Sequence, residues 1–158
     1  MRRASLCCIA CMTIFVCAGS AGAGEAWTLD SRTGDRGKSC SLARTEGNRP
    51  LSITLAFLPD TTERGVVSLA FDEPKLLQGA KKALATVQFD NGKKKHHRLE
   101  VTEDGTLLVP MVTSKVQNDL QTISESSKLT VATRHGSTSF SLDGIATHIG
   151  DLRDCAAS

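Results

Sequence analysis

The sequence predicts a mainly β protein, built as an antiparallel β-sandwich or a curved sheet with two short helices. First, apolar residues alternate with polar ones in short runs, most clearly in LSITLAF from Leu51 to Phe57, as in a strand with one buried face. Second, turn signals separate these runs, among them Asp90-Asn91-Gly92. Third, only two segments, both toward the C-terminus, show helical spacing. Strands therefore dominate, and the helices cover the sheet or close one end of a barrel.

Nine short segments fit strands. The turn-rich residues 33–37 join the first two, Asn91-Gly92 closes the hairpin between the fifth and sixth, and His135-Gly136 closes the last. The expected strands are 26–32, 38–44, 51–57, 66–71, 84–89, 96–101, 106–109, 128–134 and 138–142.

Two segments fit helices, at about residues 112–124 and 144–154. In the first, apolar residues at spacings of four, four and three share one helical face, and in the second Asp143 is placed to cap the helix start. The apolar positions are Val112, Val116, Leu120 and Ile123 in the first helix, and Ile145, Ile149 and Leu152 in the second.

The first 23 residues have the pattern of a secretory signal peptide. Arg2 and Arg3 precede an apolar run from Leu6 to Ala18, and the small residues 21–23 provide a cleavage site. The run is well short of the roughly 20 residues that span a bilayer. Lipid attachment at Cys17 is disfavoured because bulky residues precede it. We therefore expect a single β-rich domain over residues 24–158 that is periplasmic or secreted.

Two cysteines, Cys40 and Cys155, remain after cleavage. Cysteines of exported proteins usually pair, because the compartment is oxidising. The rival interpretation, a redox or nucleophilic thiol, needs a CxxC partner or a neighbouring base, and the sequence shows neither. We expect a disulfide that ties the last helix to the first hairpin.

The charges of the expected mature chain balance, because Arg2 and Arg3 leave with the signal. This disfavours a nucleic-acid partner. The distribution is nevertheless uneven: the segment from Lys75 to Arg98, here called the basic segment, holds seven basic residues and one acid, Asp90. In an exported protein such a segment fits an acidic glycan, an anionic lipid headgroup or an envelope or host-surface protein. The sequence alone favours the simpler interpretation, in which the lysines only protect an exposed strand edge from aggregation. The candidate polyanion-binding residues are Lys81, Lys82, Lys93, Lys94, Lys95, His96, His97 and Arg98.

No catalytic residue, cofactor or metal site is expected. The sequence lacks the GxSxG, HExxH and Walker-type motifs. His96 and His97 are adjacent in an expected strand and so point to opposite faces, which disfavours a shared metal ion. We expect a non-catalytic binding protein with an envelope or host-surface partner, and the alternative is an inhibitor or immunity-type protein that blocks a hydrolase with a protruding loop.

One resemblance supports this expectation. Trp27 in the first strand, a helix leading into KLTVAT, and the tail FSLDGIATHI resemble the invasion-associated locus B family of small exported bacterial proteins, mainly over the C-terminal third. The resemblance implies a periplasmic or surface-associated β-sandwich linked to host-cell interaction or envelope function. It carries over no catalytic residues.

Overall fold

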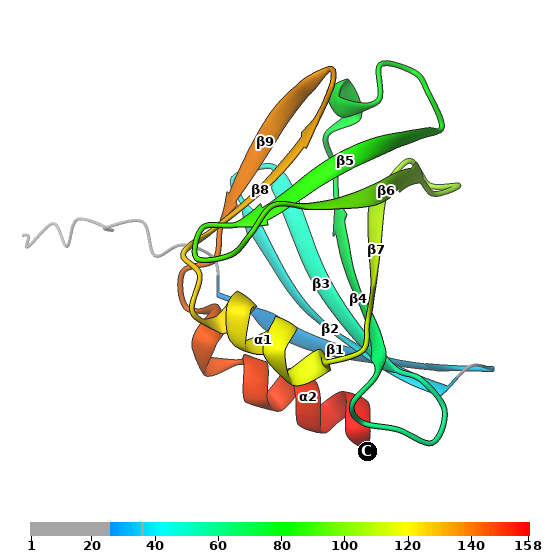
Figure 1. Cartoon of the computed structure of the whole chain (residues 1–158), viewed down its shortest axis with the longest axis vertical. Coiled ribbons are helices and arrows are strands. Elements are labelled where there is room, and N and C mark those ends of the chain that lie inside the picture. Colours follow the sequence, from blue (N-terminus) through cyan, green and yellow to red (C-terminus); the bar gives the residue numbers. More distant parts are fainter. Residues whose placement is uncertain (1–25, 36) are drawn as a thin grey trace, which may run out of the picture.

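The computed structural model of the chain describes residues 26–35 and 37–158. The predicted signal peptide, residues 1–23, lies outside the described residues. Within them the mainly β prediction is confirmed: nine antiparallel strands form one curled sheet, a half-barrel, accompanied by two short helices (Figure 1). Of the two predicted architectures, the curved sheet is the observed one.

All predicted strands are present, with ends shifted by a few residues. The sheet order is β1-β2-β3-β4-β7-β6-β5-β8-β9, so β5, β6 and β7 lie in reverse order between β4 and β8. The strands are β1 (Thr28–Gly34), β2 (Gly37–Glu46), β3 (Arg49–Phe57), β4 (Gly65–Phe71), β5 (Lys82–Phe89), β6 (Lys95–Val101), β7 (Leu107–Thr113), β8 (Lys128–Thr133) and β9 (Gly136–Ser141).

The first helix, α1 (Val116–Ser124), begins later than predicted. Val112 fits the helical spacing, but it lies in β7, pairs with Val66 and is 78% exposed. Residue 112 belongs to a strand because alternate residues of β7, including Met111 and Thr113, are buried. The two-residue period of a strand places all of them on one face of the sheet.

The second helix, α2 (Ile149–Ala157), follows a short 3₁₀ turn, η2 (Ile145–Thr147). The predicted cap by Asp143 is wrong: the residue before η2 is Gly144, at φ +79°, and no side chain caps either helix. A positive φ at this turn suits glycine, because any other residue would bring its Cβ too close to the backbone. The predicted apolar stripe is confirmed, since Ile145, Ile149 and Leu152 are all buried.

The core fills the concave side of the sheet. Alternate residues such as Ile53, Leu69 and Leu129 are fully buried there. The sheet curls until β4 faces β9, where the rings of Phe71 and Phe140 lie 5.3 Å apart. Figure 1 shows both helices at one end of the curl, and α2 packs on β1, β2 and β3.

The two ends of the domain are fastened together. The predicted disulfide is confirmed: Cys40 of β2 is bonded to Cys155 of α2, with the two Cα atoms 6.1 Å apart. The indole Nε1 of the buried Trp27 donates a hydrogen bond to the carbonyl oxygen of Asp143 at 3.0 Å. Arg44 donates to the same oxygen at 2.9 Å. The segment before β1 is thereby held on the turn that leads into α2.

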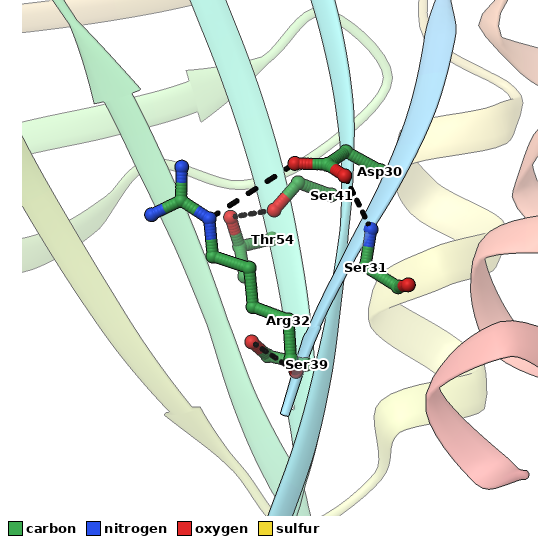
Figure 2. A network of polar contacts seen from close by, with 6 residues as sticks. All are labelled: Asp30, Ser31, Arg32, Ser39, Ser41 and Thr54. Carbon is green, nitrogen blue, oxygen red and sulfur yellow. Dashed lines mark hydrogen bonds and ion pairs between the residues drawn. The ribbon is translucent and has the colours of Figure 1, made fainter. Parts of the chain in front are cut away.

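The outer face of β1, β2 and β3 carries a polar network (Figure 2). Ser41 Oγ and Thr54 Oγ1 lie 2.7 Å apart across β2 and β3. Arg32 and Asp30 of the edge strand form an ion pair at 4.0 Å, with both side chains largely exposed. Exposed pairs of this kind stabilise a fold little, and charged side chains on an edge strand discourage pairing with another chain. This network is therefore a solvated surface.

Candidate anion-binding site

The strand geometry divides the basic segment between the two faces of the sheet. In the β5–β6 hairpin His97 lies opposite the buried Ala85, whereas His96 lies opposite Thr86 on the outer face. The prediction that the two histidines point to opposite faces is therefore confirmed. Side chains on alternate residues share a face, so Lys95 and His97 face inward and His96 and Arg98 face outward.

A cavity of about 510 Å³ lies on the inner side, between β6, β7 and α1. It exists because β6 and β7 pair at only two positions, Glu100 with Leu108 and Val101 with Leu107, and then diverge. The opening is bounded by α1 and by the turn after β5. We call this space the inner cavity; its lining includes Val87, Phe89, Lys93, Lys95, His97, Met111, Lys115, Asp119, Thr122 and Ile123.

The backbone along this gap is suited to remain unpaired. Pro110 of β7 lies opposite Ser68 of β4 and has no N–H to donate. Proline is accommodated in a strand only where its nitrogen faces away from the paired neighbour. The nitrogen of Pro110 therefore faces the gap, and a strand laid against this side of β7 would lack a donor at that position.

The inner cavity is positively charged. Three lysines line it, Lys93, Lys95 and Lys115, and among the described lining residues Asp119 is the one acid. Lys95 Nζ lies 3.1 Å from Asp119 Oδ1, so an ion pair joins β6 to α1 across the cavity. One lysine is neutralised by this pair, and the cavity keeps a net positive charge.

His97 contributes a buried polar atom to the same cavity. Its Nε2 is buried and has no hydrogen-bond partner among the described residues. Burial, and then the charge of Lys95, lowers the pKa of His97 from its ordinary value of 6.5. The imidazole is therefore mostly neutral at neutral pH, and a nearby anion would raise its pKa again.

An open groove lies on the outer face of the same hairpin. Lys82 and His96 line it together with Arg134 and His135 from the β8–β9 turn, and the exposed Leu84 lies among them. We call this the outer groove. Glu100 partly offsets the positive charge of this region, because its Oε1 lies 3.7 Å from Lys82 Nζ and 3.8 Å from Arg98 Nη1.

The structure thus gathers most of the predicted cations, but around two separate hollows. Lys81, Lys94 and Arg98 are exposed and line neither. Sequence reasoning missed Lys115, Arg134 and His135, which come from segments far along the chain. The pairing of β5 with β8 brings the last two beside β5, and no local pattern signals that pairing.

The tip of the β5–β6 hairpin is anchored. The carboxylate of Asp90 accepts hydrogen bonds from the hydroxyl and the backbone N–H of Ser127, which lower the pKa of Asp90 below its ordinary value. Asn91 Oδ1 accepts a hydrogen bond from Ser126. These contacts hold the tip on the connection between α1 and β8, unlike the protruding loop that an inhibitor would insert.

The described part of the chain holds neither a cluster of metal ligands nor a helix that could span a membrane. Within residues 26–35 and 37–158, no three His, Cys, Asp or Glu side chains are placed to hold a metal ion together. None of the helices in the same residues has the length and apolar character needed to cross a membrane.

Comparisons with protein-family models, with curated proteins and with solved structures gave no match. The resemblance to the invasion-associated locus B family therefore stays a prediction. What the chain does has to be inferred from its own geometry and charge.

Proposed function

We propose that this chain is a non-catalytic, exported protein that binds an anionic partner at the cell envelope or on a host surface through its basic segment. One observation carries the proposal. Basic side chains from distant parts of the chain gather around β6, with Lys115 on its inner side and Arg134 by its outer face, while Asp119 and Glu100 are the acids beside them.

Such a cluster favours anions by simple electrostatics. Neighbouring positive charges raise the local potential, attract an anion over several ångströms and release counterions when it binds. The attraction weakens as salt is added, because the Debye length falls from about 10 Å at 0.1 M to about 3 Å at 1 M. Salt-sensitive binding is therefore the expected signature.

The position of β6 argues against lysines that only protect a sheet edge. The terminal strands of the sheet are β1 and β9, whereas β6 lies between β5 and β7 in the order. The unpaired side of β6 faces the inner cavity, which α1 already borders. Protection against pairing with another chain is least needed at such a place.

The proposal is tested by binding of the mature, disulfide-bonded protein to phosphatidylglycerol vesicles and to heparin, at about 0.05 M and about 0.5 M salt. Lys93, Lys94 and Lys95 are changed together to Glu. The control changes Arg32, Lys38 and Arg64 to Glu, which alters the net charge equally on β1, β2 and the loop before β4.

The protein should bind at least one of the two probes at low salt and release it at high salt. Charge reversal in the basic segment should abolish binding, and the control should keep most of it. Equal loss in both variants would show that only net charge matters, and no loss in either would refute a role for the basic segment.

A further inference from the structure

We propose that the inner cavity takes the hydrocarbon chain of a single-chain anionic amphiphile, whose carboxylate or phosphate head is held by Lys93, Lys95 and Lys115. This rests on the proposed function and names the ligand class of that site. The lysines supply charge complementarity, and the walls supply the apolar surface that a compact inorganic anion would not need.

The walls of the inner cavity are apolar where the lysines end. Val87 of β5, Met111 of β7 and Ile123 of α1 line it and are each at most 9% exposed. Phe89 adds a partly buried ring. A volume of about 510 Å³ lies within the roughly 300–1,000 Å³ of small-molecule sites, which combine apolar walls with a few polar groups.

The head of the ligand would meet groups that are only partly satisfied. The ammonium of Lys95 has Asp119 as its partner at 3.1 Å, so an incoming anion competes with one carboxylate for it. His97 Nε2 is buried beside the same cavity and has no hydrogen-bond partner within residues 26–35 and 37–158. A carboxylate or phosphate there gives this nitrogen an acceptor once it carries a proton.

A second class of occupant, an extended peptide that adds a strand between β6 and β7, fits less well. Strand addition depends on main-chain hydrogen bonds along the receiving edge. Pro110 removes a donor in the middle of β7. An amphiphile needs neither main-chain pairing nor a continuous edge.

Calorimetric titration tests the ligand class, using the mature, disulfide-bonded protein with ligands kept below their micelle concentrations. The probes are dodecanoate and dodecyl phosphate, which distinguish the two heads. Butyrate shares the carboxylate but lacks the long chain, and dodecyl maltoside shares the chain but lacks the charge. Dodecanoate should bind at least about a hundredfold tighter than butyrate, since each buried methylene group increases the affinity roughly fourfold.

Variants then locate the site. Met111→Trp and Thr122→Phe fill the inner cavity from β7 and from α1 separately, so one remains informative if the other fails to fold. Each should weaken dodecanoate binding at least about tenfold while heparin or vesicle binding persists. Lys95→Gln should weaken dodecanoate binding about tenfold, as expected for the loss of one charged hydrogen bond. Asp119→Asn should strengthen dodecanoate binding. Lys38→Gln removes one charge from β2, outside both hollows; it is the matched control and should leave dodecanoate binding unchanged.

The outcomes separate this inference from the proposed function. Binding of heparin or vesicles without dodecanoate or dodecyl phosphate would overturn the amphiphile site and leave the function standing. Failure of all probes would overturn both. Dodecanoate binding that survives both cavity-filling variants would also overturn the inference, as would binding of extended peptides alone. In the expected case, histidine NMR signals should show the pKa of His97 rising when dodecanoate binds.

Discussion

Removing the disulfide should destabilise the fold strongly. The change is Cys40→Ala together with Cys155→Ala, which leaves no unpaired thiol in the domain. The bond closes a loop of 115 residues, nearly the whole domain, so its loss frees the unfolded chain far more than it disturbs the native contacts. Helix α2 keeps its buried residues Ile149, Leu152 and Ala156 against the rest of the core.

The magnitude follows from the loop length. In the chain-entropy treatment, closing a loop of 115 residues lowers the conformational entropy of the unfolded chain, which stabilises the fold by about 5 kcal/mol at 25 °C. Residual structure in the unfolded chain reduces this figure, so we expect a loss of about 3 to 5 kcal/mol. A typical domain has a total stability of about 5–15 kcal/mol, and the variant should therefore be near the limit of folding at 37 °C.

Urea unfolding is the assay, with two probes. Trp27 is the only tryptophan and is buried, so its fluorescence reports the junction between the N-terminal segment and the turn before α2. Far-ultraviolet circular dichroism reports the sheet. The midpoint should fall, and the m value should rise because the unfolded chain without the cross-link exposes more surface. A loss below about 1 kcal/mol with an unchanged m value would refute the reasoning. Residues 24–158 contain only these two cysteines, so two free thiols in this segment when it is denatured but not reduced would refute the pairing itself.

Three further predictions concern other contacts. Arg49→Ala removes hydrogen bonds to Thr138 and to the Ser139 carbonyl, and a cation–π contact with Phe140 at 4.7 Å. Urea unfolding should show that the free energy of unfolding falls by about 1–3 kcal/mol. Arg49→Lys should recover only part of this free energy. Asp90→Asn should destabilise the protein at neutral pH. The pKa of Asp90 is lowered in the folded chain, so the stabilisation that its carboxylate provides is lost as the pH falls below the ordinary value of 3.8. The difference in melting temperature from wild type should therefore shrink at low pH, and a constant difference would contradict this. The pKa of His97 is lower in the folded chain than its ordinary value of 6.5, so as the pH drops below 6.5 the unfolded chain binds this proton more readily and the stability of the fold should fall. His97→Gln should make the melting temperature less dependent on pH between about pH 7 and pH 5. An unchanged pH profile would contradict the assignment.

The strands could be predicted from the sequence because their signals are local. Alternation in the segment that became β3, and Asn91-Gly92 after β5, each depend on a few neighbouring residues. The boundary between β7 and α1 could not be predicted in this way. Val112 satisfies a helical spacing and a strand equally, and the pairing with Val66 of β4, which decides between them, is a tertiary contact.

The candidate site was predictable only in part, for the same reason. The lysines of the β5–β6 hairpin stand out as a run of charge. The inner cavity depends on where β6 leaves β7, after the pair of Glu100 with Leu108, and nothing within one strand reports that divergence. Lys115 and Arg134 become neighbours of the hairpin only through the sheet order, which short-range patterns do not specify.

The most direct test of anion binding through the basic segment is an NMR titration of ¹⁵N-labelled residues 24–158 with a short heparin oligosaccharide, at about 0.05 M and about 0.5 M salt. We predict the largest amide shifts in β6 and in the residues beside it, Lys93, Lys115 and Arg134, with the shifts lost at high salt. Shifts centred on β1 and β2, or shifts that persist at high salt, would contradict the account.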